Sequence, residues 1–316
     1  MMKRAIVTGP TGAVGLALVN ELLDNNIEVT AVVRPHSARA ARLESNVRLD
    51  IIEMPLQGLR QLPSKAKGEY DAFYHLAWDY SRDHDNVDKQ LDNVRYTLDS
   101  VYASKELGCK TFIGAGSQAE YGAKGTRIRE ESVAAPATAY GIAKLCAGMM
   151  SRKLCSQLGI SHVWPRIFSI YGPGDAETTM VISTIRKIIN GQSPPFSGGE
   201  QQWDYLYSED CARALRLIGE KGKDGKIYNI ASGEMHVLRW FIETIRDEIN
   251  PEILVKFGDI PYKKDQVMKL DVDISSLVYD TGFKPQISFH EGIRKTIKWC
   301  RSNQVILKPE ERGGTG

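Results

Sequence analysis

The sequence lacks the features that mark membrane, metal-binding and nucleic-acid-binding proteins. No uninterrupted apolar run approaches the roughly 20 residues that a membrane-spanning helix needs. The net charge is only +2 and no long basic block is present, so neither nucleic acid nor an anionic membrane is implied as a partner. The cysteines form no CxxC pair of the kind that binds zinc. They are scattered at Cys109, Cys146, Cys155, Cys211 and Cys300.

The amino terminus does not resemble a secretory signal peptide. It begins with basic residues, but the apolar run that follows is interrupted at Thr8-Gly9-Pro10. We therefore expect a cytoplasmic protein with reduced cysteines and no bound metal. At the other end, residues 304–316 finish in a polar, glycine-rich stretch, and we expect them to form a flexible tail.

The first 24 residues predict a strand, a glycine-bearing turn and a helix. A short apolar run rich in β-branched residues ends at a GxxGxxG motif that spans positions 9–15. Apolar residues then recur with helical spacing at Val14, Leu18, Leu22 and Leu23. The N–H groups at a helix start bind anions, and glycines let a pyrophosphate approach the backbone. The motif therefore indicates a dinucleotide site, although such a triplet also occurs as a tight turn in other α/β proteins.

Strands and helices alternate through the first half of the chain. Further strands are expected at 27–33, 47–52, 70–77, 110–115 and 162–168, and helical segments at 56–62, 87–107 and 139–158. This alternation predicts an α/β fold, a doubly wound parallel sheet with helices on both faces. Beyond residue 168, helices are expected at 180–189, 237–249, 275–280 and 290–300, with short strands near Tyr205 and Ile227. This half indicates a smaller α+β lobe, from which residues 226–230 could return to the first sheet.

Tyr140 and Lys144 are the residues most suited to proton transfer. They lie four apart, on one face of a predicted helix. A free tyrosine titrates near pH 10, and a cation one turn away stabilises the phenolate and lowers that pKa. The pair could then donate and accept a proton at a C–OH or C=O centre. Ser117, at the carboxyl end of a predicted strand, could bond to the same substrate oxygen. The alternative is an exposed helix that carries a tyrosine and a lysine by chance.

These motifs, in this order and spacing, resemble the extended short-chain dehydrogenase/reductases, the NAD-dependent epimerase/dehydratase group that acts on nucleotide sugars. The resemblance rests on GxxGxxG, on Ser117 in GSQAEYG and on YxxxK at Tyr140–Lys144, and it reaches to about Trp299. Further matching segments are His75-Leu76-Ala77, Asn93-Val94, RIFSIYGP at 166–173, Asp204–Tyr207 and Gly282–Pro285. The resemblance implies a Rossmann-type dinucleotide-binding domain at residues 1–168 and a smaller substrate-binding domain at 169–303.

The resemblance also implies a role for each matching residue. Tyr140 would be the acid/base, Lys144 would hold the nicotinamide ribose, and Ser117 would orient the substrate oxygen. Asn93 would lie beside the cofactor and support Lys144, unless it is an ordinary helix-surface residue. His75 is instead interpreted as a buried core histidine. The residues expected to bind the cofactor are Gly9, Thr11, Gly12, Ala13, Val14, Gly15, Arg34, Leu76, Ala77, Trp78, Asn93, Tyr140 and Lys144. Those expected to bind the substrate are Ser117, Gln118, Ser169, Trp203 and Lys263.

Four departures from the family pattern bear on the reaction and the nucleotide. Family 4,6-dehydratases carry Asp-Glu directly after the serine/threonine position, where this chain has Gln118-Ala119, so the groups that eliminate water are missing. Ser169 replaces an asparagine that contacts the sugar nucleotide in many members, and Trp203 replaces an arginine. Tyr262 or Lys263 stands where a further arginine is expected before Asp265. A dehydratase is therefore not expected, and the nucleotide stays open.

The end of the second predicted strand indicates which dinucleotide is bound. NAD-binding proteins place a carboxylate there to accept a hydrogen bond from the adenosine ribose. This chain has Arg34 instead, with Ser37 and Arg39 close behind. A guanidinium binds a 2′-phosphate through charge-assisted hydrogen bonds, so NADP is expected as the cofactor, with NAD as the alternative. Arg34 could also stack on adenine or lie in solvent.

The favoured function is NADPH-dependent reduction of a nucleotide-linked 4-keto-6-deoxyhexose at C4. The nearest alternative is an NAD-dependent nucleotide-sugar 4-epimerase that uses the same three residues. An alternative of another class is a regulator that senses a dinucleotide without catalysis. A homodimer is expected through helices 87–107 and 139–158, which carry the apolar residues Tyr96, Tyr102, Met149 and Met150. Alternatively, these side chains cover the monomer's own sheet.

Overall fold

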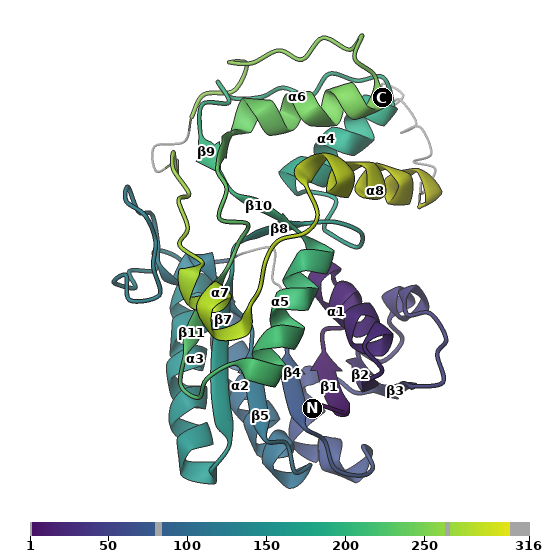
Figure 1. Cartoon of the computed structure of the whole chain (residues 1–316), viewed down its shortest axis with the longest axis vertical. Helices are drawn as coiled ribbons and strands as arrows, with labels where there is room; N and C mark the ends of the chain where they lie inside the picture. Colours follow the sequence, from purple (N-terminus) through teal and green to yellow (C-terminus); the bar gives the residue numbers. More distant parts are fainter. Residues whose placement is uncertain (1, 80–83, 263–265, 304–316) are drawn as a thin grey trace, which may run out of the picture.

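The apolar runs of the first half form one parallel sheet in the computed structural model, which describes residues 2–79, 84–262 and 266–303. The strands are β1 (Arg4–Thr8), β2 (Glu28–Val33), β3 (Leu49–Glu53), β4 (Ala72–His75), β5 (Thr111–Gly114), β6 (Gly116–Ser117), β7 (Ser161–Ile167) and β11 (Ile227–Ile230). Their order is β11-β7-β5-β4-β1-β2-β3, and β6 pairs with β7 (Figure 1). The chain order reverses between β1 and β4, and ligands bind at such a switch point in open α/β sheets.

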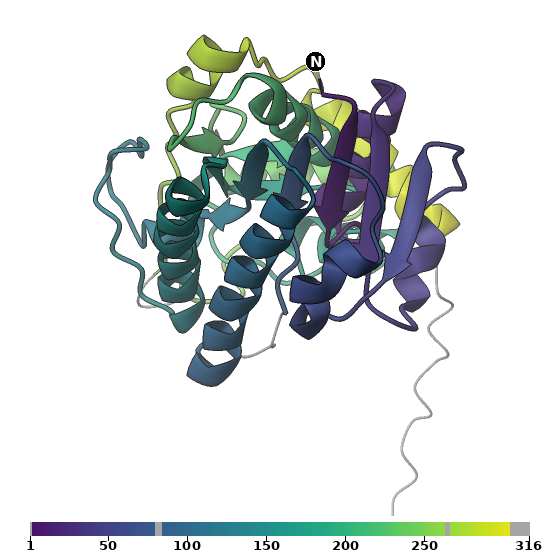
Figure 2. The same ribbon diagram turned by 90° about the horizontal axis from the view of Figure 1, so that it is seen from below.

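Helices cover both faces of this sheet. On one face, α1 (Ala13–Asp24) packs against α5 (Ser208–Lys221). On the other face, α2 (Val87–Glu106) packs against α3 (Ala139–Leu158) and the 3-10 segment η2 (Leu56–Ser64) (Figure 2). Ala5 and Val7 join the core under α1 and α5, whereas Ile6 between them joins the opposite core. Burial on both faces explains why these strands are almost continuously apolar. The predicted doubly wound α/β fold is confirmed.

The second half builds a smaller lobe beside the carboxyl ends of the strands. Two short pairs of strands lie there, β8 (Ser169–Tyr171) with β10 (Tyr205–Tyr207) and β9 (Gln202–Trp203) with β12 (His236–Val237). Three helices, α4 (Met180–Ile189), α6 (Leu238–Ile249) and α8 (Phe289–Ser302), pack around a separate apolar core that includes Tyr171 and Tyr207. Figure 1 shows this lobe above the parallel sheet.

Some elements differ from those that the sequence predicted. Helix α5 was not expected, since the sequence predicted only the short strands near Tyr205 and Ile227 that flank it. The helix buries Cys211, Leu215 and Ile218 on one face. Strand β4 stops at His75 rather than residue 77, because the chain turns there into the loop beside Gly9. The return of residues 226–230 to the first sheet, which the sequence left open, is observed: strand β11 pairs with β7, and α7 (Ser275–Thr281) packs on α5 and β11. Residues 208–221, 227–230 and 275–281 thus lie with the large sheet although they follow residue 168.

Two further expectations from the sequence concern membrane-spanning helices and the carboxyl-terminal tail. Within the ranges described, no helix has the length and apolarity that crossing a membrane requires. The tail expected at residues 304–316 lies outside the described residues.

Candidate active site

The glycine motif forms a tight loop between β1 and α1. Gly9 has a φ of +72°, and a Cβ there would lie 2.8 Å from the backbone nitrogen of Ala77. Gly15 packs against the carbonyl oxygen of Gly9, so a side chain at position 15 would also collide with backbone. Around Gly12, by contrast, the space is open, with nothing within 4 Å of the place a Cβ would take. The first two contacts shape the loop, and the open space leaves room for a ligand.

The start of α1 is prepared for an anion. Gly12 is its N-cap, no side chain caps the helix, and the first turn contains no acidic residue. The backbone N–H groups of this turn, which includes Ala13, Val14 and Gly15, are therefore directed toward the loop without a competing carboxylate. This geometry fits the pyrophosphate of a dinucleotide.

A groove of about 360 Å³ runs from this loop along the carboxyl ends of β1, β2 and β4. Seven of the residues expected to bind the cofactor line it, namely Gly9, Thr11, Gly12, Arg34, Leu76, Ala77 and Trp78. Apolar Val32 and Met54 line it as well, and they suit an adenine ring. Ser37 and Arg39 join Arg34 at its rim, where Arg34 and Arg39 are exposed. Among the described residues, the only carboxylate in the lining is Asp79, from the loop after β4 rather than the end of β2.

Tyr140 opens helix α3 and is held from two sides. Its backbone nitrogen donates to the carbonyl oxygen of His84 (3.0 Å), and the His84 ring stacks on its ring at 5.4 Å between centroids. Trp78 meets the other side of the phenol ring edge-on at 5.9 Å. The indole at the groove and the phenol at the helix start thus share one wall of the site.

Lys144 lies one turn further along α3 and is buried. Its Nζ donates to the carbonyl oxygen of Ala115 (2.7 Å) and lies 3.7 Å from the centre of the Trp78 ring. Burial lowers the pKa of Lys144 to about 7, while the carboxylate of Glu120 acts in the opposite direction. An ammonium with a pKa near neutrality exchanges its proton readily and responds strongly to any charge placed beside it.

Ser117 stands at the end of β6, and α3 packs against this strand and the turn after it. Gly141, directly after Tyr140, comes so close to this turn that a Cβ would lie 2.6 Å from the carbonyl oxygen of Ala119. The helix start and the serine turn are therefore in backbone contact. The sequence predicted that Ser117 could bond to the same substrate oxygen as Tyr140, and in the fold the turn that carries Ser117 contacts the first turn of the helix that carries Tyr140 and Lys144.

Asn93 and Gln90 hold the loop that carries Trp78. The Asn93 side chain accepts from the Asp79 nitrogen (2.6 Å) and donates to the Asp79 carbonyl oxygen (3.1 Å). Gln90 accepts from the Trp78 indole N–H (2.9 Å). Asn93 is buried, so it is not the helix-surface residue of the alternative interpretation. In this structure it fixes the wall beside Lys144, and its action on Lys144 itself stays a prediction.

Two of the residues expected to bind the substrate, Ser169 and Trp203, lie in the smaller lobe, whereas Ser117 and Gln118 lie at the end of β6 in the large sheet. Trp203 donates its indole N–H to the hydroxyl of Ser169 (2.8 Å), so two residues 34 positions apart form one surface. The side-chain oxygen of Gln118 is buried and has no hydrogen-bond partner among the described residues. An acceptor left in this state, directly after Ser117, is suited to a hydroxyl or N–H group of a bound molecule. Lys263 and Asp265 lie outside the described residues.

Other expectations concern residues away from this constellation. His75 is buried, bonds to the Thr8 hydroxyl (3.0 Å) and has its pKa lowered to about 3 by burial, so its interpretation as a core histidine is confirmed. The five cysteines are free, and only Cys146 is exposed. Across the described ranges, no group of three or more potential ligands could hold a metal ion.

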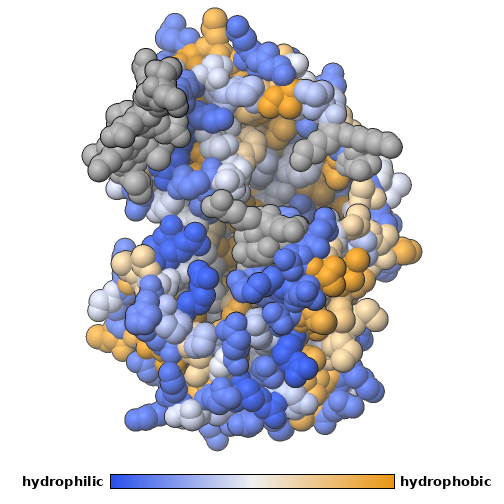
Figure 3. Space-filling view, turned by 180° about the vertical axis from the view of Figure 1, so that it is seen from behind, coloured by the Kyte–Doolittle hydropathy of each residue, from blue (hydrophilic) through white to orange (hydrophobic). Residues whose placement is uncertain are grey.

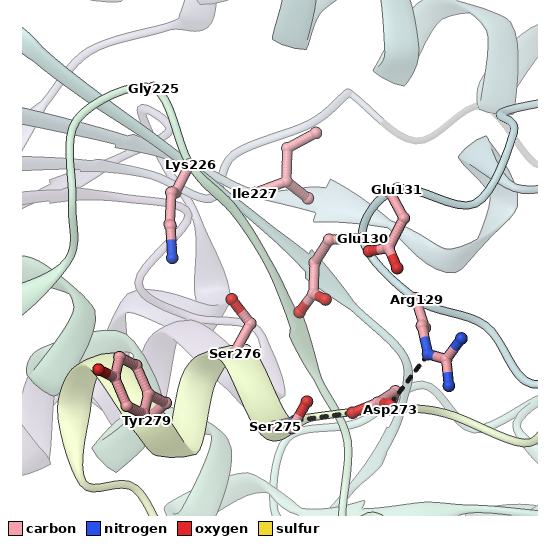
Figure 4. Close-up of a pocket in the computed structure, with 10 residues that line it drawn as sticks. All are labelled: Arg129, Glu130, Glu131, Gly225, Lys226, Ile227, Asp273, Ser275, Ser276 and Tyr279. Atoms are coloured by element: carbon pink, nitrogen blue, oxygen red, sulfur yellow. Dashed lines mark hydrogen bonds and ion pairs between the residues drawn. The ribbon is translucent and has the colours of Figure 1, made fainter.

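A larger hollow of about 720 Å³ lies elsewhere, at the outer edge of β11. Figure 4 shows it between the loop that carries Arg129 and Glu130 and the helix that carries Tyr279. Its charged groups are mostly engaged within the protein: Arg129 pairs with Asp273, and Glu130 accepts from the backbone nitrogen of Asn229. It contains none of the expected site residues and is not part of the candidate active site.

Three residues of the site were not expected from the sequence. Glu120 was overlooked although it lies three residues after Ser117, the spacing of a capping box, which both residues form. His84 and Gln90 reach Tyr140 and Trp78 from a loop and from the next helix. No local pattern marks such long-range contacts, so only the fold reveals them.

Comparisons with known proteins agree with this geometry. The model of the NAD dependent epimerase/dehydratase family matches residues 5–231. The dTDP-4-dehydro-6-deoxyglucose reductase of Escherichia coli is 26% identical, over 94% of this chain and 97% of its own length. The dTDP-glucose 4,6-dehydratase of Salmonella typhimurium is 29% identical, but the match covers only 55% of this chain and 50% of that protein.

Solved structures give the same architecture. A UDP-N-acetylglucosamine 4-epimerase from Methanobrevibacter ruminantium, in complex with UDP-N-acetylmuramic acid, superposes with a TM-score of 0.86 at 26% identity. It covers 96% of this chain and 99% of its own. A UDP-glucuronic acid 4-epimerase from Bacillus cereus, in complex with NAD, has a TM-score of 0.82 at 21% identity, covers 95% of this chain and 99% of its own, and supports the fold alone.

Proposed function

Because the chain belongs to the NAD-dependent epimerase/dehydratase family, we propose that it transfers hydride between a nicotinamide dinucleotide and a hexose carbon of a nucleotide sugar. The observation that carries this proposal is the meeting of Tyr140 and Lys144 with the Ser117 turn, beside a groove suited to a dinucleotide. A nicotinamide cofactor, when bound, supplies the hydride donor or acceptor. Gly9, Gly12, the first turn of α1 and Trp78 are the residues that would hold it.

The protein's own residues handle the proton. The Tyr140 hydroxyl donates a proton to the carbonyl oxygen of the substrate during reduction and takes it back during oxidation. The ammonium of Lys144 stabilises the phenolate that forms, and Ser117 orients the same oxygen through its hydroxyl. The Gln118 side-chain oxygen, which lacks a partner within the described residues, accepts from a sugar hydroxyl, and Ser169 and Trp203 contact the remainder of the substrate.

Within this chemistry, the reaction we propose is NADPH-dependent reduction of a nucleotide-linked 4-keto-6-deoxyhexose at C4. Arg34 and Arg39 at the groove rim support it, because guanidinium groups there favour the 2′-phosphate of NADPH. A reductase must exchange its cofactor in every cycle and draws on the NADPH pool. The full-length match to a dTDP-4-dehydro-6-deoxyglucose reductase supports the same reaction. Gln118-Ala119, in the place of the acid and base of the dehydratases, disfavours the elimination of water.

The second candidate is a nucleotide-sugar 4-epimerase, favoured by the likeness to the UDP-N-acetylglucosamine 4-epimerase at the same 26% identity. Incubation with a panel of nucleotide sugars and nucleotide 4-ketosugars, with NADPH or NADH, separates the two. A reductase consumes NADPH with a 4-ketosugar, whereas an epimerase interconverts two nucleotide sugars without net oxidation of cofactor. If no compound of the panel causes turnover, the protein is better described as a non-catalytic dinucleotide sensor.

A homodimer through α2 and α3 remains a proposal, and its basis is narrower than the sequence suggested. The Tyr96 hydroxyl accepts from Gln57 (3.0 Å), and Arg60 stacks on the Tyr102 ring, so both tyrosines are covered by η2 of their own chain. Met149 and Met150 of α3 are exposed to 66% and 49%. Ile142 on the same helix is also exposed. Figure 3, which views the molecule from behind, shows apolar residues gathered along one side of the large lobe.

We predict that light scattering at micromolar concentration gives twice the monomer mass, because burying these side chains removes apolar surface from water. The Met149→Glu/Met150→Glu variant should then be monomeric with an unchanged melting temperature. Met268→Glu is the matched control, because Met268 is also an exposed methionine (41%) but lies away from α2 and α3; this variant should leave the mass unchanged. A wild-type monomer at this concentration contradicts the interface.

A further inference from the structure

Glu120 is a fully buried carboxylate that lies directly beneath the candidate catalytic serine. One oxygen accepts from the backbone nitrogen of Ser117 (2.8 Å) and from the Trp164 indole N–H (3.0 Å). The other oxygen accepts from Nε of Arg166 (2.7 Å). In return, the Ser117 hydroxyl accepts from the Ala119 nitrogen (3.2 Å). The Glu120 carboxylate and the Ser117 hydroxyl thus each accept from a backbone N–H of the turn at residues 117–120, and these two hydrogen bonds fix the turn.

Stability alone does not explain an ion pair at this depth. The side chains of Arg166 and Glu120 are exposed to only 4% and 0%. Taking two charges out of water costs several kcal/mol per ion, and a well-packed apolar pair is often equally stable or more so. A buried pair that also binds the backbone of a candidate catalytic residue therefore points to a role in the active site.

Lys144 is the group that gains most from a nearby negative charge. It is buried against Ala115 and Trp78, and its hydrogen bond goes to a neutral carbonyl oxygen. The titratable or charged groups around it are Tyr140 on its own helix, His75 on β4 and Glu120 on the serine turn. His75 is neutral, because burial keeps its pKa far below the physiological range. Ala115, which accepts from Lys144, directly precedes Gly116, and a Cβ at Gly116 would lie 2.6 Å from a carboxylate oxygen of Glu120. Glu120 thus supplies the negative charge that favours the ammonium form of Lys144, and Arg166, bound to its other oxygen, offsets part of that charge.

We propose that Glu120 is a positioning residue of the active site, which fixes the Ser117 turn and supplies a negative charge that favours the protonated form of Lys144. The proposal rests on the proposed function, since it assigns Glu120 a role through Ser117 and Lys144. Glu120 does not touch the substrate. It acts by holding one catalytic group in place and by setting the protonation state of another.

The Glu120→Gln variant tests both parts. Its kcat should fall about tenfold or more, because a neutral amide oxygen binds the Ser117 N–H more weakly than a carboxylate does, and the amide nitrogen cannot accept from Arg166, so the Ser117 turn is held less firmly. The alkaline limb of kcat/KM that reports the loss of the Lys144 proton should move toward lower pH by about half a unit or more, because the Glu120 charge raises the pKa of Lys144. The dinucleotide dissociation constant should stay within a few-fold. The titration of Lys144 is followed independently of activity through the Nζ chemical shift in protein labelled with 15N-lysine.

A second variant separates charge from folding. In Glu120→Gln alone Arg166 is left as an uncompensated buried cation, so the variant is expected to melt at a lower temperature. Glu120→Gln/Arg166→Met removes both charges and retains an oxygen that accepts from Ser117, so it should recover thermal stability. Its Lys144 titration should nevertheless remain shifted to lower pH. Recovery of the wild-type titration together with the stability would overturn the proposal.

Glu130→Gln is the matched control. Glu130 also binds a backbone N–H, that of Asn229 (3.0 Å), but it faces the outer hollow of Figure 4. This variant should leave kcat and the Lys144 titration unchanged. Tyr140→Phe separates a failure of the role proposed for Glu120 from a failure of the proposed function. If Tyr140→Phe is inactive while Glu120→Gln behaves as wild type, only the role of Glu120 fails; an active Tyr140→Phe instead removes the proposed function.

Discussion

Replacement of Tyr140 by phenylalanine should abolish turnover and leave dinucleotide affinity within a few-fold. The phenolic proton is needed only when the substrate oxygen gains or loses charge, so its loss raises the barrier of the chemical step and spares ground-state binding. The ring itself remains, and with it the packing against Trp78 and His84. The variant should therefore fold normally, and the loss should appear in kcat rather than in KM or in the melting temperature.

The measurement is kcat with the substrate that the nucleotide-sugar panel identifies, together with the dissociation constant of the dinucleotide. Tyr279→Phe is the matched control, because this tyrosine is 85% exposed and lines the outer hollow. It should retain full activity. A Tyr140→Phe enzyme with more than about a tenth of the wild-type kcat would show that another group transfers the proton, since general acid–base catalysis contributes more than this factor.

The second large effect expected is a reversal of cofactor preference in Arg34→Asp. The wild-type protein should use NADPH with a kcat/KM at least about tenfold above that for NADH, because guanidinium groups bind a 2′-phosphate through paired, charge-assisted hydrogen bonds. Arg34 and Arg39 both line the groove at the end of β2 and are exposed. An aspartate at position 34 repels the phosphate and accepts from the ribose hydroxyls instead, so NADH should become the better cofactor.

The comparison needs kcat/KM for both cofactors in both proteins. Arg48→Asp makes the same change of charge next to the amino end of β3, whereas Arg34 follows the carboxyl end of β2. Because the two positions lie at opposite ends of the strands, Arg48→Asp should not alter the ratio of the two kcat/KM values. If wild type uses NADH at least as well as NADPH, or is purified with tightly bound NAD, the reductase proposal gives way to the 4-epimerase. An epimerase retains one cofactor through both half-reactions and has little use for a phosphate-selective groove.

The sequence by itself determined the elements that local chemistry controls. Helix α3 starts at Ala139 as expected, since the Thr138 hydroxyl accepts from Gly141, and it ends before Gly159, which adopts the left-handed conformation at φ +68°. The buried strands are visible as apolar runs because helices cover both faces of the sheet. The glycine loop is visible because its φ angle and its close backbone contacts exclude side chains.

Only the tertiary structure decided which distant residues meet. Several contacts of the site join residues that are 34 to 56 positions apart in the sequence. They are the Glu120–Arg166 pair, the Trp203–Ser169 hydrogen bond and the stacking of His84 on Tyr140. The packing of η2 on Tyr96 and Tyr102 likewise removed two residues from the expected dimer surface. Periodicity and turn propensity report a residue's burial and its local backbone, and these are properties of short segments. The partner of a buried charge or an exposed ring depends on strand order and helix packing, which no short segment encodes.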